Sequence, residues 1–387
     1  MVELSEREQE LPDLEIDKLL EIAVEHPEII SLGPGEPDFE LHPSLVAHTK
    51  RLAHKVNHYA PPGGFKELRE EICKKLKKGN KIKVSPDNVV VTCGSQEALM
   101  LATACCLDVS EQIILPDPGF MGFLPTFELF NANPRFVELK EEDDYAVNPD
   151  AVKKAVNRKK TKVLLINSPA NPTGNVLSKK ILEELADIAV EHDLYIFSDE
   201  AYEHILYDGA KHYSIASFNG MEDYAVTFQT FSKSYAMCGH RLGYVVCNED
   251  LAEAIKKTHI LSTICAPSIS QLIGLKALKM GDRHAKQMVK EYDRRRNLIV
   301  PALNEMGISC PMPKGAFYAF GNIRQFDDNS KRFCNKMIKE AKVAAVPGID
   351  FGTVGEGHAR FSFATDYKLI QKALKRMEPW LKKYRKR

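Results

Sequence analysis

The sequence lacks the features that would direct a protein to nucleic acid, to a membrane or out of the cell. Its 53 Lys and Arg residues equal its 53 Asp and Glu residues, so no excess charge attracts nucleic acid or an anionic membrane surface. No stretch reaches the roughly 18 apolar residues that a membrane span needs. Residues 1–13 are acidic and have no apolar core, so we expect no signal peptide. We therefore expect no nucleic-acid partner and no membrane partner.

Paired cysteines and metal-ligand clusters are also missing from the sequence. The nine cysteines are an odd number and none forms a CxxC motif, which is typical of a reducing compartment and predicts a cytoplasmic protein. His54 and His58 are one helical turn apart and His48 precedes them, but no carboxylate or cysteine completes a set of ligands. We expect no metal.

Short apolar runs alternate with helical patterns between residues 47 and 280. Residues 162–167 are nearly all apolar, which is typical of a strand buried on both faces of a parallel sheet. The predicted strands are 88–93, 112–115, 135–139, 162–167, 194–198, 225–228 and 242–247. Helical patterns between them predict an α/β fold with a mostly parallel seven-stranded sheet in one large domain.

The pattern changes beyond Gly281. A long charged helix is predicted over 285–306, and a mixed α+β region follows it. We interpret residues 281–387 as a smaller C-terminal domain. Residues 1–46 are expected to form an N-terminal arm and part of that small domain.

Lys233 lies in the segment from Thr230 to Gly243, among hydroxyl-bearing and small residues. Arg241 follows eight positions later, just before an apolar strand. This composition suits a phosphate group near a lysine that can form an imine. A lysine after a strand is also commonly a solvated surface residue, so the spacing alone leaves both interpretations open.

Three further polar segments lie at the ends of predicted strands. The Asn171–Gly174 turn follows one strand, Asp199–Tyr202 ends the next, and Gly94–Gln96 opens a helix directly after a third. Open α/β sheets bind ligands at the carboxyl ends of their strands, and a helix N-terminus attracts anions. Taken singly, the first is a common Asn-Pro turn and the third contains a common N-cap serine.

These four segments, in this order, resemble the class I aminotransferase family, enzymes of fold type I that use pyridoxal 5′-phosphate (PLP). The resemblance runs from the segment 31–39, SLGPGEPDF, to the segment 358–362, HARFS. It implies a large domain that binds PLP and a smaller α+β domain. It also implies transamination, the transfer of an amino group from an amino acid to a 2-oxo acid.

The resemblance implies a role for each matching residue. Lys233 is expected to hold PLP as an imine and then to move a proton as a base. Asp199 is expected to pair with the pyridine nitrogen, with Asn171 and Tyr202 at the phenolate oxygen. The remaining cofactor contacts are expected from Phe120 on the ring face and from a set around the phosphate: Gly94, Ser95, Gln96, Thr230, Ser232 and Arg241.

The resemblance also implies the substrate contacts and the assembly. Arg360 is expected to bind the α-carboxylate as a bidentate fork, with Gly35 and Asn171 alongside. Tyr59 matches the tyrosine that family members donate to the partner subunit's phosphate site. We therefore expect a homodimer with shared active sites.

The substrate side chain and the reaction remain open to alternatives. Residues 202–207, 212–217 and 291–296 look most like archaeal aromatic-amino-acid aminotransferases, and Phe39, Phe123 and Phe351 lie in segments that could supply apolar walls. Aspartate is the alternative donor, with 2-oxoglutarate as acceptor. A PLP-dependent Cβ–S lyase on the same fold is a second reaction to consider. A PLP-sensing transcriptional regulator is disfavoured, because the roughly thirty residues before Gly33 are too few for a DNA-binding domain.

Overall fold

The structure of the protein is a computed structural model. The structure describes residues 4–5, 8–9, 11–12, 18–19, 21–22, 25–54 and 56–384. Part of the expected N-terminal arm and residues 385–387 therefore lie outside the described residues.

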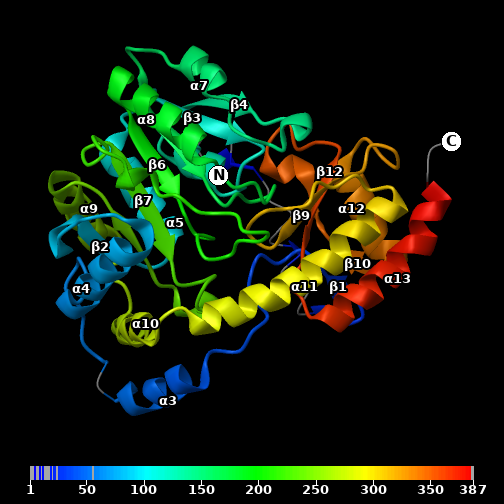
Figure 1. The fold of residues 1–387 in the computed structure, drawn as a ribbon, viewed down its shortest axis with the longest axis horizontal. Helices are drawn as coiled ribbons and strands as arrows, with labels where there is room; N and C mark the ends of the chain where they lie inside the picture. Colours follow the sequence, from blue (N-terminus) through cyan, green and yellow to red (C-terminus); the bar gives the residue numbers. More distant parts are fainter. Residues whose placement is uncertain are drawn as a thin grey trace.

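A seven-stranded sheet dominates the larger part of the structure, with strand order β2-β8-β7-β6-β5-β3-β4 (Figure 1). Its strands are β2 (Val89–Thr92), β3 (Gln112–Asp117), β4 (Asn133–Glu138), β5 (Thr161–Asn167), β6 (Tyr195–Asp199), β7 (Ala225–Thr230) and β8 (Gly243–Val246). All neighbouring pairs are parallel except those that β8 makes with β2 and β7. The predicted fold class and all seven predicted strands are confirmed.

The sheet is covered by helices on both faces, as the apolar run of β5 predicts. Val163 and Leu165 join one buried cluster, whereas Leu164 and Ile166 join another. Successive side chains of a strand point to opposite faces, so each face of the sheet carries its own core. The helices that alternate with the strands are α4 (Lys66–Lys75), α5 (Ser95–Cys106), α6 (Phe123–Leu129), α7 (Pro149–Ala155), α8 (Lys179–His192), α9 (Glu249–Ser262) and α10 (Ser268–Met280).

The C-terminal part contains a separate antiparallel sheet with order β11-β12-β9. Its elements are α11 (Arg283–Met306), β9 (Tyr318–Asn322), α12 (Ser330–Ala341), β10 (Val343–Ala344), β11 (Val346–Pro347), β12 (His358–Ser362) and α13 (Tyr367–Tyr384). In Figure 1 the long helix α11 runs from beside α10 to this part. The N-terminal strand β1 (Ile30–Ser31) pairs in parallel with β10, which brings the segment that follows it next to the C-terminal sheet.

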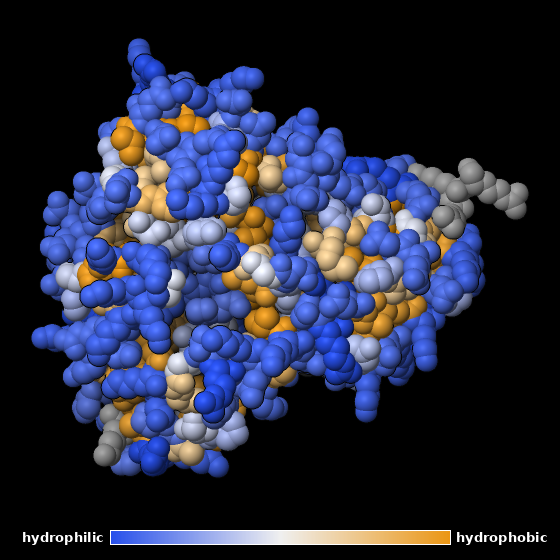
Figure 2. Space-filling view, viewed as in Figure 1, coloured by the Kyte–Doolittle hydropathy of each residue, from blue (hydrophilic) through white to orange (hydrophobic). Residues whose placement is uncertain are grey.

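The remaining elements are short or peripheral. They are α3 (Pro43–Leu52), the π-helix η1 (Leu76–Asn80) and the 3-10 helices η2 (Pro86–Asn88), η3 (Glu141–Asp143), η4 (Ile215–Ser217), η5 (Cys238–His240) and η6 (Gly348–Phe351). The face in Figure 2 is mostly hydrophilic, with hydrophobic side chains in separate patches. Within the described residues, no helix combines the length and apolar character that crossing a bilayer requires.

Candidate active site

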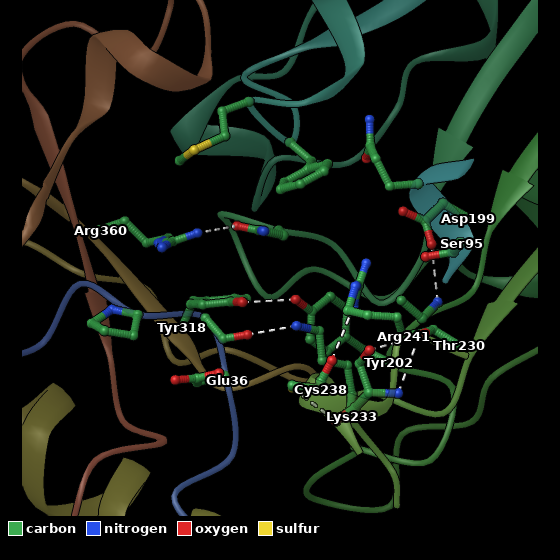
Figure 3. A pocket seen from close by; sticks show the side chains of 18 residues that line it. Glu36, Ser95, Asp199, Tyr202, Thr230, Lys233, Cys238, Arg241, Tyr318 and Arg360 are labelled. Atoms are coloured by element: carbon green, nitrogen blue, oxygen red, sulfur yellow. Dashed lines mark hydrogen bonds between the residues drawn. The ribbon is translucent and has the colours of Figure 1, made fainter. Parts of the chain in front are cut away.

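A cavity of 310 Å³ opens where the carboxyl ends of the central strands meet the C-terminal sheet. Segments following β3, β5, β6 and β7 reach it from the large sheet, as expected for an open α/β sheet. Gly35 and Arg360 come from the N-terminal segment and from β12. The cavity is lined by Pro34, Gly35, Glu36, Ser95, Gln96, Phe120, Met121, Asn171, Asp199, Ala201, Tyr202, Thr230, Ser232, Lys233, Cys238, Arg241, Tyr318 and Arg360 (Figure 3).

The structure brings almost all of the predicted site residues to this one cavity. Gly94 does not line it, but lies directly before Ser95 at the start of α5. Tyr59 also lies outside it, with 79% of its surface exposed. That exposure suits the expectation that Tyr59 serves a partner subunit.

Lys233 reaches across the cavity toward the N-terminal segment. Its Nζ donates a hydrogen bond to the carbonyl oxygen of Gly35 at 2.6 Å. Because β7 ends at Thr230, the lysine lies on the turn just beyond a strand end, with its side chain directed into the cavity (Figure 3). The amine is therefore placed where a bound molecule would meet it.

Asp199 is the last residue of β6 and presents its carboxylate to the cavity. Its Oδ1 accepts the backbone N–H of Ala201 at 3.1 Å. Burial raises the pKa of Asp199 to about 6, and the neighbouring Glu200 adds to this shift. A carboxylate that is this costly to ionise is stabilised by a cationic partner, such as a protonated ring nitrogen.

One end of the cavity is built to hold an anion. The N-terminus of α5 offers the free amides of Ser95 and Gln96. Thr230 Oγ1 donates a hydrogen bond to Ser232 Oγ at 3.0 Å, so the two hydroxyls lie together. Arg241 Nη2 lies beside the same turn and donates to the Cys93 carbonyl at 3.4 Å.

Gly94 makes the close approach of Arg241 possible. Its φ is +89°, a left-handed conformation that favours glycine, and a Cβ there would lie 2.8 Å from Arg241 Nη2. A larger residue would therefore clash with the guanidinium as well as strain the backbone. The glycine predicted from sequence thus shapes the anion end without lining the cavity.

Arg360 is 2% exposed and faces the cavity from β12. Its Nη1 donates to Asn171 Oδ1 at 2.9 Å and its Nη2 donates to the Gly33 carbonyl at 2.7 Å. Its Nε is buried and has no hydrogen-bond partner among the residues that the structure describes. Burial lowers the pKa of Arg360 from its usual value, yet an arginine remains charged at neutral pH. A carboxylate ligand would supply a further hydrogen-bond partner and a countercharge in direct contact with the guanidinium.

The sequence did not identify Tyr318 as a site residue. Its hydroxyl lies 2.7 Å from the hydroxyl of Tyr202, and the Arg360 guanidinium lies 4.4 Å from its ring centre. A Cβ on Gly35 would lie 2.4 Å from the Tyr318 hydroxyl. The side chain therefore touches three predicted site residues at once.

Other lining residues were missed as well, although several are neighbours of predicted ones. Glu36 follows Gly35, Met121 follows Phe120, and Ala201 lies between Asp199 and Tyr202. The sequence could have identified these three residues by their position next to a predicted site residue. The missed lining residues are Pro34, Glu36, Met121, Ala201, Cys238 and Tyr318.

The donor set fits a phosphate-bearing aromatic cofactor. An anion end, a half-buried carboxylate that makes no ion pair among the described residues, and an amine share one cavity with an aromatic wall at Phe120. Arg360 keeps a buried Nε free for a second, carboxylate-bearing ligand. The arrangement can hold a phosphorylated ring and an amino or oxo acid side by side.

Comparison with known proteins establishes the family. A sequence model of the family described as aminotransferase class I and II matches residues 27–377. The chain belongs to this family and is a transaminase by class.

Similar proteins cover nearly the whole chain. An aspartate aminotransferase of Pyrococcus abyssi is 44% identical over 95% of both chains. An aromatic-amino-acid aminotransferase of Thermococcus litoralis is 42% identical over 98% of both. Among solved structures, the aromatic aminotransferase of Pyrococcus horikoshii matches with a TM-score of 0.89 and 43% identity, covering 95% of this chain and 99% of its own. The names of these relatives point to two different donors.

Proposed function

We propose that this aminotransferase binds PLP in the cavity and transfers the amino group of an aromatic amino acid to 2-oxoglutarate. The observation that carries the proposal is the meeting of Lys233, Asp199, Arg241 and Arg360 in one cavity. Bound PLP supplies an electron sink that makes the proton on the substrate's α-carbon removable.

Lys233 is proposed to hold the cofactor and to move the proton at the substrate's α-carbon. In the structure its Nζ is already directed into the cavity by the Gly35 carbonyl. An amine held by one hydrogen bond can turn toward either a cofactor or a substrate carbon. Covalent attachment and proton transfer both require this reach.

Asp199, Asn171 and Tyr202 are proposed to hold the ring. The Asp199 carboxylate would keep a ring nitrogen protonated, which in turn gives the buried carboxylate its countercharge. Asn171 is fixed because its backbone N–H donates to Asn167 Oδ1 at 2.8 Å. Tyr202 is fixed through its hydroxyl contact with Tyr318. Phe120 is proposed to pack on the ring face.

The phosphate is proposed to bind at the anion end. Arg241 supplies charge, and the hydroxyls of Thr230 and Ser232 supply directed donors beside it. The helix amides of Ser95 and Gln96 complete the set. We name the backbone from Cys93 to Gln96 the phosphate turn.

Arg360 is proposed to bind the α-carboxylate shared by every donor and acceptor. Its contacts with Asn171 and Gly33 hold the guanidinium in one orientation, and Gly35 leaves room beside it. A fixed fork positions the α-carbon near Lys233, which reduces the entropic cost of reaction.

The cavity lining supports an aromatic donor over aspartate. Its cationic members are Lys233, Arg241 and Arg360, and each already has a proposed role. No further cation of the lining is dedicated to a distal carboxylate, so the distal end of the acceptor 2-oxoglutarate must be accommodated by a far end of the cavity that rearranges between donor and acceptor. Met121 and Tyr318 supply apolar surface instead.

None of the three phenylalanines considered from the sequence is among the residues that line the cavity, although the Phe351 ring centre lies 4.9 Å from the Arg360 guanidinium. Phe123 and Phe351 line a neighbouring apolar cavity of 240 Å³, which shares Phe120 and Met121 with the site. Phe39 packs edge-on against Tyr292, with ring centres 5.4 Å apart. Packing of these rings against other elements was not visible in the local sequence.

The test of the proposal is a comparison of donors with 2-oxoglutarate as acceptor. The kcat/KM for phenylalanine or tyrosine should exceed that for aspartate. An aspartate value about a hundredfold above both, or about 2.7 kcal/mol, would show an aspartate enzyme instead. Release of pyruvate and ammonia from cystathionine without any acceptor would favour the Cβ–S lyase, which the comparisons do not favour.

A homodimer is proposed from the surface around Tyr59. Tyr59 lines a cavity of 620 Å³ together with Cys93, the first residue of the phosphate turn. Leu261, at the end of α9, is 86% exposed, and Ile260 and Ile264 beside it are also exposed. Large exposed apolar side chains of this kind mark protein interfaces. A second copy packed here would bring each Tyr59 near the other copy's phosphate turn.

The domain division and the location of the protein are also proposals. The separate sheets support a large domain over 47–280 and a small domain over 281–387. The pairing of β1 with β10 supports assigning residues 1–46 partly to the small domain. All nine cysteines are free, in keeping with a cytoplasmic protein.

A further inference from the structure

His259, on α9, is fully buried directly behind the phosphate turn. Its Nδ1 lies 2.8 Å from the carbonyl oxygen of Pro62. Its Nε2 lies 3.2 Å from Glu97 Oε2, an ion-pair contact that is too bent to count as a hydrogen bond. The imidazole thus joins α9 to the segment that carries Tyr59 and to the first turn of α5.

The contacts fix the protonation of this ring. A backbone carbonyl only accepts hydrogen bonds, so Nδ1 must carry a proton. Nε2 faces a carboxylate, which also only accepts when ionised. Burial lowers the pKa of His259, but the contacts with Cys93 and Glu97 outweigh it and raise the pKa to about 9. His259 is therefore an imidazolium at neutral pH.

Glu97 connects this charge to the phosphate turn. Its Oε2 accepts the backbone N–H of Cys93 at 2.6 Å, and its Oε1 accepts Thr263 Oγ1 at 2.7 Å. Burial raises the pKa of Glu97, but the contacts with His259, Cys93 and Thr263 lower it to about 2. An ionised carboxylate thus holds the first residue of the turn in place. Without a countercharge, the Glu97 carboxylate would also repel a phosphate bound at Ser95 and Gln96, which directly precede it in the chain.

We propose that His259 is a positioning residue for the phosphate turn, acting as the counter-ion of Glu97. The imidazolium of His259 compensates the charge of the Glu97 carboxylate. The hydrogen bond from the Cys93 amide to that carboxylate is retained. Through Pro62, it also ties the turn to the segment that bears Tyr59. This inference rests on the proposed function, because it requires a phosphate at Ser95 and Gln96.

A metal ion is the competing explanation for this cluster. Atoms of Cys93, Glu97 and His259 lie within 4.8 Å of one another. However, a metal would need a neutral Nε2 and would compete with the Cys93 amide for Glu97 Oε2. The ion pair between His259 and Glu97 satisfies the charges of both side chains without a metal ion.

The test compares PLP with pyridoxal, which lacks the phosphate, by absorbance titration of the full-length chain stripped of cofactor. His259→Gln should weaken PLP binding about tenfold or more and change pyridoxal binding by less than about twofold. Adding Glu97→Gln should restore most of the loss, because the uncompensated carboxylate is then gone. A general packing defect would weaken both ligands and would not be repaired by the second substitution.

His192→Gln is the matched control. His192 ends α8 just before the amino end of β6, whereas the phosphate turn follows the carboxyl end of β2. Its side chain is also buried, so the His192→Gln substitution should leave the PLP-to-pyridoxal ratio unchanged. A His259→Gln protein with the wild-type ratio overturns the inference. A wild-type protein that does not prefer PLP to pyridoxal overturns the proposed function instead.

Two measurements on the wild-type holoenzyme keep the inference testable if the variant does not fold. Neutron diffraction at pH 8 should show deuterium on both nitrogens of His259, and a bare Nε2 would overturn the assignment. Dialysis against EDTA should not change PLP affinity. A loss of affinity that zinc restores would show that the cluster is a metal site.

Discussion

Arg360 Nη1 donates a hydrogen bond to Asn171 Oδ1 at 2.9 Å, although the two residues are 189 positions apart in the sequence. Asn171 follows β5 of the seven-stranded sheet, and Arg360 lies on β12 of the antiparallel sheet. The contact therefore joins the two sheets inside the cavity. It also aligns the proposed carboxylate-binding guanidinium with the proposed cofactor site.

Arg360→Lys should lower kcat/KM about a hundredfold or more, mainly by raising KM. Lysine keeps the charge but loses the planar fork, and it cannot hold both Asn171 and a carboxylate in one orientation. Steady-state kinetics with an aromatic donor measures the effect. Arg158→Lys, at an exposed side chain, is the control and should behave as wild type. A loss of less than about threefold at Arg360 would contradict the role.

Asp199→Asn should stabilise the cofactor-free protein at pH 8. The folded pKa of about 6 lies above the ordinary aspartate value of 3.8, so the folded state holds the proton of Asp199 more tightly than the unfolded state does. Stability contributed by this group therefore falls as pH rises from about 4 to 6, and the penalty, about 3 kcal/mol at most, is complete above that range.

Urea unfolding at pH 5 and pH 8 checks this prediction for Asp199→Asn. The gain in unfolding free energy should be larger at pH 8 than at pH 5. Asp223→Asn, on the exposed surface, should show no such difference between the two pH values. An Asp199→Asn protein less stable than wild type at pH 8 would mean that the carboxylate already has a cationic partner. The same substitution should lower transamination by orders of magnitude.

Tyr318→Phe should lower kcat/KM about fivefold to tenfold. It removes the hydroxyl that contacts Tyr202 and keeps the ring beside Arg360, so the loss corresponds to about one hydrogen bond. Tyr145→Phe is the control, because the buried Tyr145 hydroxyl has no hydrogen-bond partner within the described part of the chain. Equal activity of the two variants would show that the Tyr202 contact does not matter for the reaction.

Mixed dimers test the proposed sharing of Tyr59. If Tyr59 serves the partner, a dimer of one Lys233→Ala chain and one Tyr59→Ala chain contains one site with both defects and one with neither, whereas otherwise each site carries one defect. If Tyr59 serves the partner, such heterodimers should regain about half of the wild-type activity per dimer. If Tyr59 serves its own chain, they should stay at or below the activity of the Tyr59→Ala protein. Differently tagged chains allow the heterodimers to be isolated.

Local patterns in the sequence were enough to predict the large sheet. Each strand is a short apolar run whose burial follows from composition, as the two-sided packing of Leu164 and Leu165 shows. The predicted ends of individual elements were less accurate than the predicted number and order of the strands. The strand predicted over 135–139, for example, spans Asn133–Glu138, because its first two residues, Asn133 and Pro134, are of types that are rare in strands.

Site residues at or just beyond the carboxyl ends of strands, such as Asp199 and Lys233, could be predicted from the sequence. Tyr318 was not, because it reaches the cavity only through the pairing of β9 with β12. His259 was hidden for the same reason, since its partners Pro62 and Glu97 come from distant segments. Contacts between elements depend on three-dimensional packing, which a local pattern does not encode.

The most direct test of the account is to locate the cofactor chemically. The purified protein is incubated with PLP, reduced with borohydride, digested and mapped by mass spectrometry, with a Lys233→Ala protein treated in parallel. Reduction should fix the cofactor to the peptide that contains Lys233, and the Lys233→Ala protein should bind PLP without retaining it after denaturation. A label on any other lysine, or equal labelling of the Lys233→Ala protein, would contradict the central claim that Lys233 holds the cofactor.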